Sequence, residues 1–571
     1  MFIPATKEEM DALGWDCLDV VLVTGDSYID HPSIGVAVIG HVLLDAGFRV
    51  GIIAQPDTDS DADIARLGEP RLFWGVTGGS IDSMVANYTA AGKRRKSDDY
   101  TPGALNNRRP DRALIVYTNL IRRFFKNTRP IILGGIEASL RRIAHYDFWS
   151  NSIRRSILFD AKADILVYGM GERAVVELAE GLKDGQDLTG IRGLCYIAKD
   201  KPPSCIELPS YETVAADKHA FMEMFQCFSD NTDWASAQGL CQLQDTRYLV
   251  QNPPQKLLTE KELDRVYEMD FERGLHPVYA QQGEVRAMET IRFSITTHRG
   301  CFGQCSFCSI APHQGRTVIS RSERSILKEA QEFTSHPEFK GIIADVGGPT
   351  ANMYGMECGQ KGAHRECRTR HCLVPRVCSL LRVDHSAQIR LLEKLRQIPG
   401  VKSVIVASGI RHDLVMADTG HGRRYLEELI RHHISGQMKI APEHTEDAVL
   451  ALMGKPGKES LIAFKDLFYR LNRSCGRKQF LTYYLIAAHP GCTVEDMNRL
   501  KDVSFQELRI NPEQVQIFIP LPSTLSGVMY YTEKDPLSGE SIFVETDRNR
   551  RQKQKDIIIA KKRFKKRSPR R

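Results

Sequence analysis

Alternation of apolar runs with amphipathic segments dominates the first third of the chain. Five short apolar runs are typical of buried parallel strands, at residues 18–25, 49–54, 72–76, 130–135 and 163–169. Helix-like periodicity follows two of them, at residues 35–46 and 172–182. Strands that alternate with helices favour a doubly wound parallel sheet, so we predict a Rossmann-like α/β domain over residues 1–200.

The same alternation returns in the second half of the chain. Residues 201–290 are rich in proline, with Pro202-Pro203 and Asn252-Pro253-Pro254, and are predicted to form an irregular connection. Strand-like runs then recur at residues 293–297, 341–346, 401–409, 438–444, 482–491 and 515–524. At least five βα units in this order predict a partial (β/α)6 barrel over residues 291–530, with an insertion at residues 355–380. A length of 571 residues suits such a division.

Charge is distributed unevenly along the chain. The net charge is +7, but residues 548–571 hold thirteen Lys or Arg against one acid, so the remainder is mildly acidic. Within the C-terminal extension, residues 531–571, we predict disorder from Lys561 onward. Such a basic arm attracts RNA without sequence preference, through release of counterions. A solubilising tail is the alternative interpretation.

Composition excludes a membrane protein and favours metal chemistry. No apolar run reaches the roughly 18 residues of a membrane span, and the N-terminus lacks a signal-peptide pattern, which predicts a cytoplasmic protein without a membrane partner. Fourteen cysteines in a large chain of this kind indicate metal or redox chemistry before a disulfide framework.

Three cysteines in the middle of the chain form the most informative motif. Cys301, Cys305 and Cys308 are separated by three and then two residues, with glycines nearby and Phe307 directly before the last. A tight loop of this kind turns three thiolates toward one metal centre. An iron-sulfur cubane with one open iron fits three ligands. A Cys3His zinc site that uses His298 or His313, or a disulfide loop, is also compatible with the spacing.

This motif resembles the signature of the radical S-adenosylmethionine (SAM) superfamily. The flanking segments His298-Arg299-Gly300 and His313-Gln314-Gly315-Arg316 resemble its YgiQ-type subgroup. The resemblance implies a [4Fe-4S] cluster on Cys301, Cys305 and Cys308, with SAM on the fourth iron. It also implies reductive cleavage of SAM to a 5′-deoxyadenosyl radical that abstracts hydrogen from substrate, and a flavodoxin-like or ferredoxin-like electron donor.

The resemblance extends to the N-terminal domain, which is similar to the cobalamin-binding type that precedes many radical SAM barrels. Members that ligate cobalt carry Asp-x-His-x-x-Gly after the first strand. Here the loop reads Asp30-His31-Pro32-Ser33-Ile34-Gly35, so histidine and glycine stand at a different spacing. Cobalamin is therefore doubtful, and His31 is interpreted first as an ordinary loop residue.

Further candidate residues follow from position in the predicted barrel. Gly347 and Gly348 match the Gly-Gly pair that approaches SAM, whereas Pro349 replaces the acid that usually follows. Ser408 ends another strand and is a candidate for cofactor binding. The catalytic residues are unknown; the candidates at strand ends are Lys439, Glu443 and His489. Each of them can equally serve as a hydrogen-bonding group without chemistry.

Two other clusters leave their interpretation open. The insertion contains a second group of cysteines, Cys358, Cys367, Cys372 and Cys378. Three interpretations of this group stay open: ligands of an auxiliary iron-sulfur cluster, ligands of a structural zinc, or free thiols. The basic segments at residues 93–96 and 106–110 form a solvated face or contact a phosphate-bearing substrate.

Two functional hypotheses follow. The first is a radical SAM enzyme with an unidentified substrate, for which modification of tRNA or rRNA is one option by analogy with relatives. The second is a nucleic-acid-binding protein in which both cysteine groups carry zinc and no radical forms.

Overall fold

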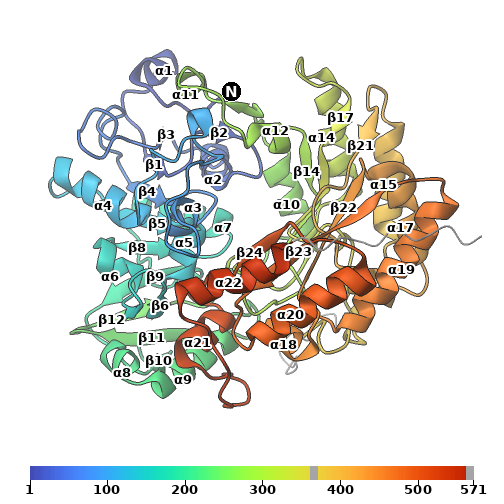
Figure 1. The fold of residues 1–571 in the computed structure, drawn as a ribbon. Helices are drawn as coiled ribbons and strands as arrows, with labels where there is room; N and C mark the ends of the chain where they lie inside the picture. Colours follow the sequence, from blue (N-terminus) through green and yellow to red (C-terminus); the bar gives the residue numbers. More distant parts are fainter. Residues whose placement is uncertain (360–370, 561–571) are drawn as a thin grey trace, which may run out of the picture.

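The computed structural model describes residues 1–359 and 371–560, which fold into two α/β units (Figure 1). The N-terminal unit is built on a nine-stranded sheet in the order β10-β11-β12-β9-β8-β5-β4-β1-β3. Its parallel part consists of β1 (Val20–Thr24), β3 (Val50–Ala54), β4 (Phe73–Thr77), β5 (Ile131–Gly134) and β8 (Ile165–Val167). Numbered along the chain, these strands have the spatial order 2-1-3-4-5 of the flavodoxin-like doubly wound sheet. The Rossmann-like prediction is confirmed.

Helices cover both faces of this sheet. Helices α2 (Gly35–Asp45) and α7 (Glu172–Asp184) pack on one face, and α4 (Ala113–Phe124) and α6 (Ile157–Ala161) on the other. Successive strand side chains point to opposite faces, so Val21 joins the core under α4 while Leu22 joins the core under α2. Burial on both faces explains why these strands are continuously apolar.

The sheet continues into the segment predicted as a connection. Strand β9 (Leu194–Ala198) is followed by β10 (Cys205–Leu208), β11 (Gly239–Gln244) and β12 (Arg247–Gln251), with α9 (Lys218–Asp230) packed against them. The structure thus differs from the irregular connection predicted for residues 201–290. The Pro202-Pro203 pair lies just before β10 and the Pro253-Pro254 pair just after β12, where they interrupt no strand pairing.

The barrel unit begins with β14 (Ser294–Thr296), which pairs in parallel with β18 (Asp345–Gly347). Strand β17 (Ile342–Ile343), just before β18, pairs with β21 (Ser403–Val404), and a bridge from Ile410 to Ile440 leads to β22 (Gln437–Glu443). Strands β23 (Phe480–Ala487) and β24 (Val515–Ile517) complete the parallel series. The partial (β/α)6 barrel is confirmed.

Helices cover the outside of the barrel strands. They are α14 (Glu323–Ser335), α15 (Ser386–Gln397), α17 (Gly422–Glu428), α19 (Lys458–Ser474) and α20 (Val494–Val503). The apolar stripes of the first four bury the strands in one core with Ile295, Val346 and Ile440. The barrel is therefore a packed unit of its own, with its loops free to form a site.

The C-terminal extension contributes an ordered helix, α22 (Arg548–Ile559), which lies between the two units (Figure 1). Gln554 accepts a hydrogen bond from Ala488 N and donates one to Cys492 O, both in the loop after β23. The Arg551 guanidinium stacks on Phe148 of the N-terminal unit. The predicted disorder from Lys561 onward concerns residues outside the described part of the chain and stays a prediction.

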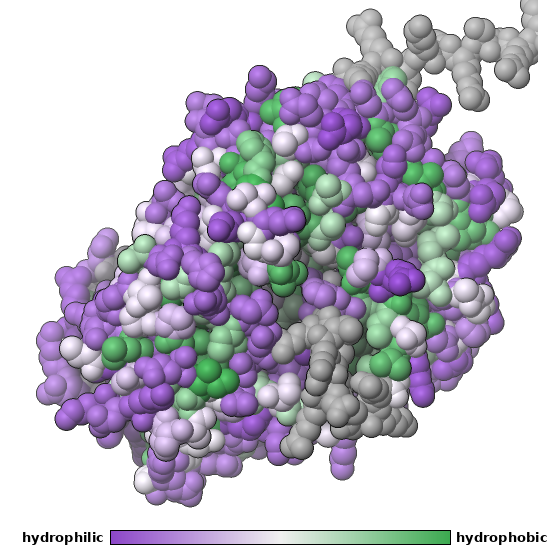
Figure 2. Space-filling model, turned by 90° about the horizontal axis from the view of Figure 1, so that it is seen from below, coloured by the Kyte–Doolittle hydropathy of each residue, from purple (hydrophilic) through white to green (hydrophobic). Residues whose placement is uncertain are grey.

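Polar side chains dominate the surface seen in Figure 2, with apolar groups in small patches and a hollow near the centre. Within residues 1–359 and 371–560, no helix has the length and apolar character needed to cross a membrane.

Candidate functional site

The loop that carries Cys301, Cys305 and Cys308 is here called the cluster loop. It follows the short strand β15 (His298–Arg299) and precedes helix α13 (Ile310–Gln314). A Cβ atom placed on Gly303 would lie 3.2 Å from the Cys301 sulfur and 3.7 Å from the Cys305 sulfur. Backbone N–H groups donate to two of the sulfurs, from Gly303 to Cys301 at 3.3 Å and from Ile310 to Cys308 at 3.4 Å. The loop thus places the Cys301 and Cys305 sulfur atoms near each other, and backbone N–H groups donate hydrogen bonds to Cys301 and Cys308.

Burial keeps two thiols of the loop in the neutral form unless a metal coordinates them. Burial, together with the neighbouring Cys305 sulfur, raises the pKa of the Cys308 thiol to about 12. Burial likewise raises the pKa of Cys301. A thiol in this environment ionises readily only when a metal coordinates it, because the metal charge replaces the lost hydration.

Two buried cations stand beside the same sulfurs. Arg411 Nη1 lies 3.7 Å from the Cys305 sulfur, and Asp413 holds the guanidinium at 2.6 Å. Lys455 lies 3.4 Å from Glu443 and acts electrostatically on Cys305. These cations would offset the negative charge of a thiolate-ligated cluster.

The predicted cofactor residues line the neighbouring barrel mouth. A Cβ on Gly348 would lie 2.6 Å from His298 Nε2 and 2.7 Å from His298 O, so only glycine fits there. Ser408 N donates to Asp345 at 3.1 Å, and the Ser408 hydroxyl donates to the same carboxylate. Gly347, Gly348, Ser408 and Asp345 all face one cavity.

This cavity of about 510 Å³ reaches from the barrel mouth to the N-terminal sheet. Its sheet half is lined by the loops after β1, β4, β5 and β8, including Asp26, Gly79, Gly135 and Gly171. Strands β1 and β4 are the topological switch point, where open α/β sheets form ligand crevices. The cluster loop borders the cavity through Arg299 and Ile310, and Cys301 contacts Thr350, next to the lining residue Pro349.

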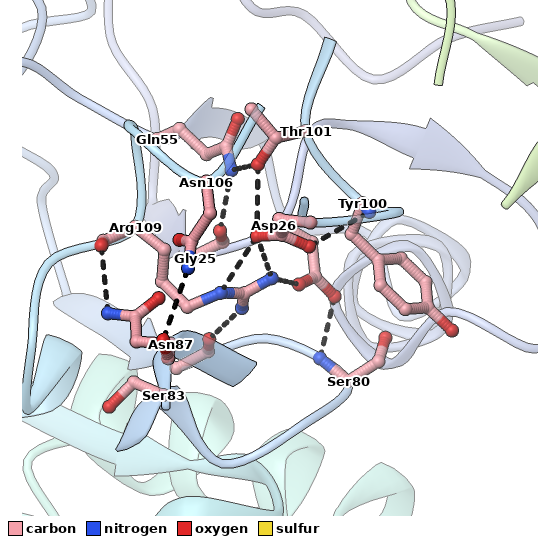
Figure 3. Close-up of polar contacts among 12 residues, drawn as sticks. Gly25, Asp26, Gln55, Ser80, Ser83, Asn87, Tyr100, Thr101, Asn106 and Arg109 are labelled. Carbon is pink, nitrogen blue, oxygen red and sulfur yellow. Dashed lines mark hydrogen bonds and ion pairs between the residues drawn. The ribbon is translucent and has the colours of Figure 1, made fainter. Parts of the chain in front are cut away.

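A buried ionic network supports the sheet half (Figure 3). Arg109 Nη2 lies 2.7 Å from Asp26 and 3.0 Å from Asp98, and Arg109 Nη1 donates to Gly78 O at 2.7 Å. Asp26 also accepts a hydrogen bond from Ser80 N at 2.6 Å. The basic segment at residues 106–110 therefore contributes one internal, neutralised arginine, whereas residues 93–96 are exposed.

The three catalytic candidates lie away from the cavity lining. His489 is fully buried and contacts Ser526 Oγ at 2.7 Å through Nε2. Glu443 is paired with Lys455 beside the cluster loop, with a backbone φ of 68°. Lys439 is half-buried on β22. Lys439 and Glu443 lie on β22 and His489 lies two residues after β23, and none of the three lines the 510 Å³ cavity.

Each histidine that could complete a zinc site uses Nδ1 in a hydrogen bond, and His298 Nε2 is buried beside Gly348 without a hydrogen-bond partner among the described residues. His298 Nδ1 contacts Thr297 Oγ1 at 2.8 Å, and His313 Nδ1 contacts Ser139 Oγ at 3.0 Å. In the loop after β1, His31 is buried between Ser33 Oγ at 2.7 Å and Arg273 Nη1 at 2.9 Å. His31 is thus an internal hydrogen-bonding residue.

Part of the second cysteine group packs near the cluster loop. Cys358 lies on β19 (Glu357–Cys358), which pairs with β20 (Leu381–Arg382), and Cys378 N donates to Cys372 O at 2.8 Å. Cys372 and Cys378 pack against the same apolar cluster as Cys301. Cys367 lies outside the described residues.

Comparison with known proteins identifies the family. The model of the family described as "Radical SAM N-terminal" matches residues 2–294 of this chain. A UPF0313 protein of Fusobacterium nucleatum is 56% identical over 566 residues, which cover 99% of this chain and all of the relative. A UPF0313 protein of Thermotoga maritima is 50% identical over 565 residues, 98% of this chain and 99% of the relative. The chain belongs to the radical SAM family. It is an enzyme of the radical SAM class.

Solved structures of radical SAM enzymes share its fold. The radical SAM methyltransferase TsrM from Kitasatospora setae, with cobalamin and a [4Fe-4S] cluster bound, gives a TM-score of 0.51 at 16% identity, over 90% of this chain and 74% of that chain. The cobalamin-dependent SAM radical enzyme OxsB gives 0.52 at 12% identity, over 91% of this chain and 56% of that chain. At these identities the likeness concerns the arrangement of the two units.

Several site residues of this radical SAM enzyme were not predicted from sequence. Asp345, Arg411 and Lys455 stand beside the cofactor residues or the cluster loop. Asp345 could have been identified from the sequence, because an acidic residue within an otherwise apolar barrel strand needs polar neighbours. Arg411 and Lys455 lie more than 100 residues from the cysteines in sequence, so only the fold brings them together.

Proposed function

We propose that this enzyme binds a [4Fe-4S] cluster through Cys301, Cys305 and Cys308 and cleaves SAM reductively to modify a substrate in the 510 Å³ cavity. The observation that carries the proposal is the gathering of the three cysteines, with N–H donors and two buried cations, beside the mouth lined by Gly347 and Gly348. When bound, the cluster and SAM supply a 5′-deoxyadenosyl radical, while the chain positions substrate and excludes water.

Geometry favours a cubane over a single zinc ion. Around one tetrahedral zinc with bonds of about 2.3 Å, sulfur atoms lie roughly 3.8 Å apart. Among the described residues, the one set of three metal-ligand atoms that all lie within 4.8 Å of one another is Asp384, Asp418 and His421, so the three cysteine sulfurs are spread more widely. A cubane is larger than one ion and suits the wider spacing.

The test is anaerobic purification followed by reduction. Protein reconstituted with iron and sulfide should be brown, with about four irons per cluster, and should release 5′-deoxyadenosine from SAM with dithionite. Cys305→Ala should lose both properties. Cys475→Ala, which removes a partly buried thiol at the end of α19, should keep them. A colourless protein that retains zinc, or a full cluster that never cleaves SAM, would overturn the proposal.

The metal content also decides the second cysteine group. An auxiliary iron-sulfur cluster predicts about eight irons per chain, a structural zinc adds one zinc, and free thiols add neither. Cys378→Ala should remove only the additional metal. The electron donor is proposed to be flavodoxin-like or ferredoxin-like, and RNA is proposed as a partner of the basic C-terminus.

A corrinoid is a second candidate occupant of the sheet half of the cavity. Both structural neighbours are described with cobalamin, and the cavity here extends over the switch point of the sheet. Because His31 is held by Ser33 and Arg273, we propose binding without a histidine ligand to cobalt. Absorption spectra of protein incubated with hydroxocobalamin and desalted test this. Complete loss of the corrinoid on desalting excludes it.

A further inference from the structure

Arg142 is a fully buried cation that forms no ion pair with a carboxylate among the described residues. Its side chain is 2% exposed and lies between the rings of Tyr168 and Phe228, at 4.6 Å and 4.5 Å from their centroids. Nε donates to Gln251 Oε1 at 3.0 Å, and Nη1 donates to Ser139 O. Burial lowers the pKa of this guanidinium, and the ionisable groups that act on it among the described residues are Tyr168 and Cys195.

Three other buried arginines are paired with carboxylates, whereas Arg551 is stacked on two aromatic rings as Arg142 is. Arg141, the adjacent residue, is equally buried but is paired with Asp82. Arg299 is paired with Glu172 and Arg411 with Asp413. Stacking on aromatic rings and bonds to neutral acceptors offset part of the cost of burying Arg142, but an unpaired buried charge remains expensive. An unpaired arginine of this kind lowers the stability of the fold unless an anion binds to it.

A chamber beside Arg142 provides room for one. It has a volume of about 100 Å³ and is lined by Arg142, Tyr168, Thr232, Asp233, His313 and Arg316, among others. Its remaining buried charges are balanced, because Arg316 pairs with Asp233 at 3.0 Å and Arg299 with Glu172. Exposed Lys256 also lines the chamber, so it reaches the surface near that residue.

The chamber shares a wall with the main cavity. Gly169, Met170, Arg299, His313 and Gln314 line both spaces. Ser139 connects Arg142 to this wall, since its carbonyl accepts from Arg142 and its hydroxyl contacts His313 at 3.0 Å. An anion on Arg142 would therefore lie one layer of side chains from the space proposed for substrate.

We propose that the chamber is an anion subsite in which Arg142 binds a carboxylate. Nε and Nη1 each donate one hydrogen bond, so Nη2 and the second Nη1 hydrogen remain for a small planar partner, and 100 Å³ limits the group to that size. Resting on the proposed function, the subsite assigns a carboxylate-bearing compound as the substrate class. Its unreactive end is held at Arg142, and its reactive end reaches the 510 Å³ cavity when the side chain of His313 moves out of the shared wall.

Thermal unfolding of the full, cluster-loaded enzyme tests the subsite, with sodium acetate as the probe and sodium chloride at equal ionic strength as the reference. Acetate should raise the Tm of the wild type in a saturable manner, because a ligand of the folded state stabilises it. Arg142→Met should abolish the response and, in chloride, should unfold at or above the wild-type Tm, since the unpaired charge is gone. Arg141→Met, the matched control, should unfold at a lower Tm because it leaves Asp82 buried without a partner.

The outcomes are distinct. Equal Tm values of the wild type in acetate and chloride, or an unchanged acetate response in Arg142→Met, overturn the subsite. A larger response to sodium phosphate than to acetate overturns the assignment to a carboxylate. Should Arg142→Met not fold, crystals of the wild type grown in acetate decide the question: a planar anion on Arg142 supports the proposal, and water alone refutes it. Cys305→Ala should retain the acetate response, which separates failure of the subsite from failure of the radical chemistry.

Discussion

Arg411 Nη1 lies 3.7 Å from the sulfur of Cys305, while Asp413 binds the other edge of the same guanidinium at 2.6 Å and 2.9 Å. Lys455 adds a second buried positive charge near that sulfur and is paired with Glu443. An iron-sulfur cluster becomes more negative when it is reduced. Cations at this distance therefore favour the reduced state, in which SAM is cleaved.

Replacing Lys455 by Met should lower the reduction potential of the cluster. Loss of one partly neutralised charge at this range corresponds to about 1–2 kcal/mol, on the order of 50–90 mV for one electron. Redox titration followed by electron paramagnetic resonance measures the shift. Lys458→Met, which removes a partly exposed lysine, should leave the potential unchanged.

Replacing Gly348 by Ala should impair binding of SAM. The new methyl group would overlap His298, so either the imidazole or the Gly347-Gly348 backbone must move away from the barrel mouth. We expect an increase in the Kd for SAM of at least about tenfold, equivalent to 1.4 kcal/mol, at unchanged iron content. Gly409→Ala is the matched control, because a Cβ at Gly409 meets no atom within 4 Å. Equal affinity in both variants would contradict the role of Gly348.

Features that depend on local sequence patterns were predicted correctly, and features that depend on contacts between distant residues were not. Continuous apolar strands and the Cys301-x3-Cys305-x2-Cys308 spacing are local patterns, and from them both units and the cluster loop were predicted. Strands β10 to β12 were missed because their flanking prolines were interpreted as a connection, although proline at strand ends costs no pairing. The candidates Lys439 and His489 were chosen by position alone, and side-chain orientation could not be inferred from sequence.

Stability should decrease between pH 6.5 and pH 4. Burial lowers the pKa of His145 to about 4, with Arg141 adding to the effect, whereas an unfolded histidine titrates near 6.5. In this interval the unfolded chain binds a proton that the folded chain does not, so stability is complete above pH 6.5 and falls as pH decreases. His145 alone should account for about 2 kcal/mol at pH 5. Urea unfolding at pH 5 and pH 7.5 measures it, and His145→Gln should reduce the difference; an unchanged difference contradicts the assignment.

Two truncations separate the C-terminal helix from the basic segment that follows it. Removal of residues 548–571 deletes α22, so Ala488 and Cys492 lose the hydrogen bonds to Gln554, and Phe148 and Tyr530 lose Arg551. The Tm of this variant should fall by several degrees, because a buried polar side chain and an interunit contact are lost together.

Removal of residues 561–571 alone should leave the Tm unchanged, since α22 is retained. It deletes eight Lys or Arg. Affinity for RNA should therefore decrease, and the dependence of binding on salt concentration should become shallower, because fewer counterions are released. Fluorescence anisotropy with a labelled tRNA at 50 and 200 mM salt measures both quantities. If the shorter chain binds RNA as tightly and with the same salt slope, the basic end is a solubilising tail, and any RNA contact must be sought at residues 93–96.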